Sequence, residues 1–97
     1  MTLRNKLQTS VWFEAKSMDD HHGIGFKCES MEQLKQSIDV EEQHTTEQGY
    51  PANKWQIVRG KSNKVFNRYG EFMYESIKRE AVAVYDGGEI TLYGEGA

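Results

Sequence analysis

Apolar and polar residues alternate along the N-terminal part of the chain. In residues 10–16 every second side chain is apolar, and Trp12 lies on the more polar side of this alternation. Residues 23–28 alternate in the same way and place Cys28 on the apolar side. A period of two is typical of strands that bury one face, and the polar segment between the two runs has the length of a hairpin loop. An N-terminal β-hairpin is therefore predicted, with Trp12 on the open face of its sheet.

The next segment has the spacing of a helix, with three apolar residues on one stripe. Ser30 is a preferred N-cap residue, and Gln33 follows it at the spacing of a capping box. Gly49 suits the position just beyond the last helical turn, and Pro51 cannot continue a helix. These signals predict a helix over about 31–48.

The second half of this helix lacks an apolar stripe. Residues 41–48 contain no apolar side chain, so we expect this half to project into solvent, to fray, or to contact another molecule. Glu41, Glu42 and Glu47 are the candidate residues for a secondary acidic surface, which could contact a basic protein or mimic nucleic-acid phosphates. A plain solvated helix end explains the same residues.

The chain after the helix has the pattern of short strands joined by turns. Residues 54–59 are rich in β-forming side chains, and residues 60–63 are of turn-forming types. A returning strand is predicted to begin at residues 65–66, and a second turn follows at residues 67–70.

Residues 71–80 allow two predictions. As a helix, this segment places Met73 and Ile77 on one side and an i,i+4 ion pair of Glu75 and Arg79 on the other. As a strand, it separates apolar from charged side chains less well, although its first residues also resemble a hairpin tip. The helix is the favoured prediction, and the strand is the alternative.

The last segment is predicted to be a β-hairpin. Residues 81–85 and 90–93 are rich in β-formers, and the turn between them, 86–89, contains two glycines that can adopt a positive φ. The sum is one α+β domain over residues 1–97. It consists of an antiparallel sheet built from hairpins, with one or two helices packed on one face, in the order ββαββ(α or β)ββ.

Composition narrows the class of protein. The chain has 97 residues, of which 37% are hydrophobic, and a net charge of −3, which fits a single folded domain with a small core. Cys28 is the only cysteine, so an intramolecular disulfide is impossible. The sequence contains no secretory signal and no apolar run of roughly 18 residues that could cross a membrane. A reducing cytoplasm is the expected location.

Metal binding and catalysis are not expected. Asp19, Asp20, His21 and His22, with Cys28 nearby, are of the right types for zinc, but adjacent residues on an extended chain point apart. A hydrophilic loop explains them better. No nucleophile, base and orienting group occur together, and a small core leaves little room for a water-excluding pocket. We therefore predict a protein that is not an enzyme and binds no cofactor.

The distribution of charge is the most distinctive feature of the sequence. Residues 48–70 carry five basic side chains and no acid, between two segments with net negative charge. Aromatic residues are interleaved with these cations, as at many protein interfaces and nucleic-acid sites. The alternative is a small core bordered by a solvated edge. The predicted partner-binding residues are Trp55, Arg59, Lys61, Lys64, Arg68 and Tyr69.

The leading functional hypothesis is a small protein-binding module, acting as an accessory factor, adaptor or inhibitor through its aromatic and arginine surface. Compact polar chains without motifs are often found among phage and mobile-element accessory proteins. The alternative is a nucleic-acid-binding module that uses the basic hairpin 54–69, although the sequence pI of about 5.6 is low for that class. A homodimer is a further expectation, because a symmetric partner often completes a small core.

Overall fold

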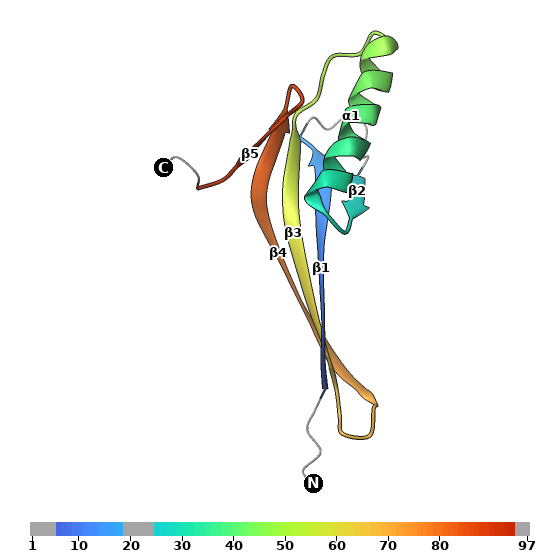
Figure 1. The fold of residues 1–97 in the computed structure, drawn as a ribbon, viewed down its shortest axis with the longest axis vertical. Helices are drawn as coiled ribbons and strands as arrows, with labels where there is room; N and C mark the ends of the chain where they lie inside the picture. Colours follow the sequence, from blue (N-terminus) through green and yellow to red (C-terminus); the bar gives the residue numbers. More distant parts are fainter. Residues whose placement is uncertain (1–5, 19–24, 95–97) are drawn as a thin grey trace.

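The computed structural model describes residues 6–18 and 25–94, which form one sheet and one helix (Figure 1). The elements are β1 (Lys6–Ser17), β2 (Gly25–Cys28), α1 (Met31–Glu47), β3 (Trp55–Phe66), β4 (Phe72–Asp86) and β5 (Glu89–Leu92). The sheet has the strand order β2-β1-β3-β4-β5, and every neighbouring pair is antiparallel. The α+β class and the antiparallel sheet with a helix on one face are confirmed.

Two parts of the sheet differ in how they are covered. Near the helix the sheet is five strands wide, whereas β1, β3 and β4 continue far beyond it as a narrow three-stranded ribbon (Figure 1). The molecule is accordingly elongated, with principal extents of 63 × 32 × 21 Å. We call the ribbon, residues 6–11 and 61–78, the β arm, and we call the rest of the described chain the body.

The core lies between α1 and the upper part of the sheet. Leu34 and Ile38 of the helix are fully buried against a layer of sheet residues that includes Ala15, Ile57 and Ala83. These three sheet residues are opposite one another in neighbouring strands, so they share one face. We call this the helix face of the sheet and the other the open face.

Local signals at the helix ends are confirmed. The Ser30 hydroxyl accepts a hydrogen bond from the backbone N–H of Gln33 at 3.2 Å, as an N-cap does. Gly49 has a φ of +86° just beyond the helix, a conformation that glycine adopts without steric cost.

Most of residues 41–48 are exposed, as expected, but this segment also packs against the rest of the chain. Thr45 is buried, and the Glu42 carboxylate accepts hydrogen bonds from Trp55 Nε1 at 2.7 Å and from the backbone N–H of Asn53 at 3.1 Å. A polar helix segment can pack when buried donors supply hydrogen bonds to it. The second half of α1 is therefore held against the segment that leads into β3.

The hairpin and turn predictions near the C-terminus are confirmed. Asp86 pairs with Glu89, and Gly87 and Gly88 between them have φ of +59° and +87°, as a two-residue hairpin turn of this type requires. The turn at 67–70 is also present, with Asn67 Oδ1 accepting the backbone N–H groups of Tyr69 and Glu71.

The middle of the sheet corrects three predictions. Residues 65–66 end β3 and do not begin a returning strand, because β3 runs without interruption from Trp55 to Phe66. Residues 60–63 lie inside β3, because the missing side chain of Gly60 leaves the space that the indole of Trp12 fills across the strands. Residues 72–80 lie in β4 and not in a helix, since β3 pairs with this segment in one antiparallel register interrupted only by a bulge at Met73. The strand alternative is thus confirmed.

Candidate functional site

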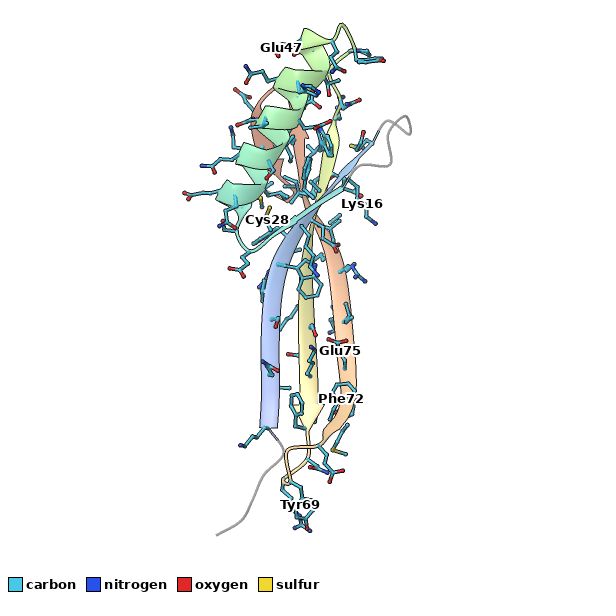
Figure 2. All side chains as sticks on the ribbon, turned by 90° about the vertical axis from the view of Figure 1, so that its right-hand side faces the viewer. Lys16, Cys28, Glu47, Tyr69, Phe72 and Glu75 are labelled. Carbon is cyan, nitrogen blue, oxygen red and sulfur yellow. The ribbon has the colours of Figure 1, made fainter. Side chains whose placement is uncertain are left out.

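The β arm has no covering layer. Residues 71–81 are all exposed, and large apolar side chains of β1, of β4 and of the turn between β3 and β4 are among the most exposed of the described chain. Tyr69 is 71% exposed, Leu7 64% and Phe72 58%. Figure 2 shows Tyr69 and Phe72 at the end of the ribbon that lies away from the helix. The remaining apolar side chains exposed on the arm are Val11, Met73, Tyr74 and Ile77.

Apolar side chains occupy both faces of the arm. Leu7, Val65 and Tyr74 lie opposite one another in the three strands and continue the helix face. On the open face, the rings of Phe66 and Phe72 meet edge to face, with centroids 5.9 Å apart. A two-stranded or three-stranded ribbon without a packed layer cannot bury both of its faces by itself.

Both edges of the arm lack a neighbouring strand among the described residues. The short strand β2 pairs with β1 only at 13–16, and β5 pairs with β4 only at 83–86. The outer backbone of β1 before residue 13, and that of β4 from 72 to 81, therefore presents hydrogen-bonding groups to the surroundings. Such edges are templates for pairing with another chain.

Five of the six predicted partner-binding residues are exposed, whereas the sixth belongs to the core. Trp55 is 1% exposed and donates its indole N–H to Glu42. Its inclusion in a surface cluster is wrong, because its position in β3 points toward the helix. The exposed members are Arg59, Lys61, Lys64, Arg68 and Tyr69.

The exposed cations do not gather on one side of the sheet. Arg59 and Lys61 belong to the helix face, and Lys61 lies opposite Lys78 with no acid between them. Lys64 belongs to the open face, opposite Glu75. Arg68 lies in the turn, with its guanidinium 5.1 Å from the centre of the Tyr69 ring. Positive charge is thus spread around the arm.

The three predicted acidic residues do not act as one surface. Glu42 is committed to Trp55 and Asn53, as described above. Glu41 is half-buried, and Glu47 is exposed and accepts a hydrogen bond from Gln43 at 3.3 Å. The sequence could not separate these glutamates, because the partner of Glu42 lies 13 residues away.

A groove of about 460 Å³ lies on the open face where the arm joins the body, lined in part by Trp12, Lys27, Glu75 and Arg79. Three of its five charged side chains have partners within the described chain. Lys27 lies 4.5 Å above the Trp12 ring, Ser62 donates a hydrogen bond to Glu75, and Arg79 Nε lies 3.3 Å from Glu14. Most of the charged side chains in the groove are therefore already engaged within the chain.

No metal site or catalytic centre is evident in the described part of the chain. No group of three or more His, Cys, Asp or Glu side chains within it could hold a metal ion. The loop residues considered for zinc, Asp19, Asp20, His21 and His22, lie outside the described residues. Cys28 is half-buried on the helix face, with Sγ 3.9 Å from Ser37 Oγ.

Asp39 and Tyr85, the two described groups whose pKa is shifted, lie where α1 meets the sheet. The ion pair and hydrogen bond with Lys35, followed by the hydrogen bond from Tyr85, hold the pKa of Asp39 below its usual value. Burial, followed by the hydrogen bond to Asp39, raises the pKa of Tyr85. Both groups tie the sheet to α1.

Comparison of the chain with protein-family models, with curated proteins and with solved structures finds no match. Within the described residues, no helix is long and apolar enough to cross a membrane. Function is therefore inferred from the chemistry and geometry of the chain itself.

Proposed function

We propose that this chain is a small protein-binding module, not an enzyme, that docks on its partner through the β arm. Its place would be the cytoplasm, as an accessory factor, adaptor or inhibitor. The observation that supports this proposal is the segment Phe72–Ala81, which is exposed on both faces and along one edge. Contiguous apolar exposure of this kind marks protein interaction surfaces.

Strand addition is the binding mode that suits such an arm. A partner strand would satisfy the outer backbone groups of β1 or β4, while the side chains of the arm set specificity. Tyr69, Tyr74 and Arg68 are of the types that most often dominate binding energy at protein interfaces. They lie at the end of the arm, where no part of the described body approaches them.

Site-specific photo-crosslinking tests the proposal. A photoreactive phenylalanine analogue replaces Tyr74 on the arm, and in a matched control it replaces Glu47 on the exposed end of the helix. Adducts with a protein are expected from position 74 in cells that encode the chain, and not from position 47. Adducts from neither position, or equally from both, would contradict docking through the arm.

Nucleic-acid binding is the second candidate function. It is favoured by the basic stretch, in which Lys61 and Lys78 face each other and are both exposed. Against it, the cations lie on both faces of the arm, whereas a site that tracks phosphates gathers them on one. Fluorescence anisotropy of labelled oligonucleotides at two salt concentrations separates the candidates, because log affinity should fall with log salt by about 0.7–0.9 per phosphate neutralised. Loss of that signal in the variant Lys61→Ala would locate the site on the arm.

A further inference from the structure

We infer that a second copy of this chain pairs with the β arm, edge to edge, through β4. The inference rests on the proposed function, because it names the partner of the same arm. The free edge of β4 is bounded on one side by the turn at 67–70 and on the other by β5, which pairs from Ala83 onward. A symmetric antiparallel pair formed here would merge two sheets into one.

The register of such a pair is restricted by symmetry. A two-fold axis through two antiparallel copies of one strand must pass beside a residue that faces its own copy. If that residue is Ile77, Met73 lies opposite Ala81 of the second copy, and the pairing extends along the whole free edge. It stops where β5 begins to cover β4, so no described strand has to move.

Charge complementarity favours this register over its neighbours. Centring on Ile77 places Glu75 opposite Arg79 of the second copy, and symmetry repeats the pair on the other side of the axis. Centring on Ser76 places Glu75 opposite Ile77 and Arg79 opposite Met73, so neither charge has a partner of opposite sign. Opposite charges directly across an antiparallel pair stabilise it, whereas other registers forgo this gain.

Within one copy, the two side chains that would form these ion pairs contact β3 and β1, and each keeps polar atoms for a further partner. Ser62 donates to one carboxylate oxygen of Glu75, and Glu14 accepts from Nε of Arg79. The second oxygen of Glu75 and the two terminal nitrogens of Arg79 are left for another partner. Ile77, which is 46% exposed, would lie between the two ion pairs on the same face and contact its own copy.

The same register accounts for exposed apolar side chains at the end of β5. The backbone N–H of Tyr93 donates to the carbonyl of Val82, and Leu92 and Tyr93 are 39% and 48% exposed. In the pair, Met73 of the second copy falls opposite Ala81, next to the place that Tyr93 already occupies beside Val82. The end of one arm would then lie against the end of β5 of the other copy.

Crosslinking and sedimentation test this arrangement on the full chain with Cys28→Ser. A short bis-maleimide should join two copies carrying Ile77→Cys, and should not join copies carrying Gln8→Cys on the free edge of β1. Equal crosslinking of both variants, or crosslinking of Gln8→Cys alone, would overturn the proposed edge.

Charge reversal tests the register. By sedimentation equilibrium, Glu75→Arg should weaken self-association by about tenfold or more, since like charges then face each other, and adding Arg79→Glu should restore it to within about threefold. Far-UV circular dichroism verifies that each variant is folded. A monomer mass for the unmodified chain at about 100 µM, or no recovery in the double variant, would overturn the inference.

Failure of self-pairing through β4 can be distinguished from failure of the proposed docking function. If the chain is a monomer but position 74 still gives adducts with a different protein, self-pairing through β4 is overturned and docking through the arm is retained. If position 74 gives no protein adduct of any kind, the proposed function fails as well.

Discussion

Replacing Gly60 with alanine tests why a glycine lies in the middle of the longest paired region of the sheet. Gly60 is buried and lies directly opposite Trp12 in β1. A Cβ at this position would lie only 2.5 Å from both Nε1 and Cζ2 of the indole, and it would overlap Cε2. The indole is itself 8% exposed, with Lys27 above its ring, so it cannot shift without losing contacts.

Gly60→Ala is expected to lower the free energy of unfolding, whereas the same substitution in an ordinary strand raises it. Glycine inside a strand is usually about 0.5–1 kcal/mol less favourable than alanine. Forcing a methyl group into a filled space costs about 1–3 kcal/mol, and a displaced indole also loses its interaction with Lys27, worth about 0.5–1 kcal/mol. Nε1 of Trp12 is buried without a hydrogen-bond partner in the described chain. A displaced indole can bond water through Nε1, which offsets part of the lost stability. The free energy of unfolding should fall by about 1–2 kcal/mol.

Urea unfolding followed by circular dichroism measures the change, and the same substitution in a Trp12→Ala background provides the control. Without the indole, Gly60→Ala should raise stability by up to about 1 kcal/mol. The tryptophan emission of the single variant should shift to longer wavelength as Trp12 enters water. The reasoning is refuted if Gly60→Ala is at least as stable as the unmodified chain, or if its effect is equal in both backgrounds.

Other substitutions test the hydrogen bonds of the body. Ser30→Ala should lower the free energy of unfolding by about 1 kcal/mol through loss of the N-cap, and an unchanged urea midpoint would contradict that role. Glu42→Ala leaves two buried N–H groups without their acceptor, so a loss of about 2–3 kcal/mol is expected, with partial recovery in Glu42→Gln. Burial, followed by the hydrogen bond to Asp39, raises the pKa of Tyr85. The stability that the neutral Tyr85 hydroxyl contributes is therefore present below about pH 10 and is lost as the pH rises further. Urea midpoints that stay constant between about pH 8 and about pH 11 would contradict the last prediction.

Features encoded by neighbouring residues could be predicted from the sequence. Ser30 caps the helix through a backbone group three residues away, and the glycines at 87–88 adopt the positive φ that their turn requires. In both cases the residue and the backbone group that it affects are only a few positions apart, so the sequence alone is sufficient to predict the feature. The α+β class followed from these elements.

The long strands could not be predicted, because distant residues determine them. Residues 60–63 are of turn-forming types, and only the indole of Trp12, 48 positions earlier, explains why a glycine continues the strand. Apolar side chains occupy both faces of the arm, so β4 lacks the alternation that usually identifies a strand. Without that alternation, the four-residue spacing of Met73 and Ile77 favoured the prediction of a helix.

The candidate site was predicted in part for a related reason. Composition located the basic exposed residues, such as Lys61 and Arg68, because charged side chains are rarely buried. It could not exclude Trp55, whose burial depends on the glutamate on α1 that accepts its N–H. Most exposed apolar residues of the arm, such as Tyr74, were absent from the predicted set, because exposure on two faces is a property of the ribbon and not of its residue types.

The strand order also determines when the chain can fold during its synthesis. Among the described strands, β2 offers β1 pairing at only four positions, whereas β3, about 50 residues later, pairs with β1 along its whole length. A nascent chain that ends before β3 can thus form α1 and a short hairpin, but the centre of the sheet stays open. Contacts so distant in sequence form slowly, and partly folded chains expose the surfaces that chaperones bind. Assembly of the sheet therefore waits for β3, the one strand that both β1 and β4 require.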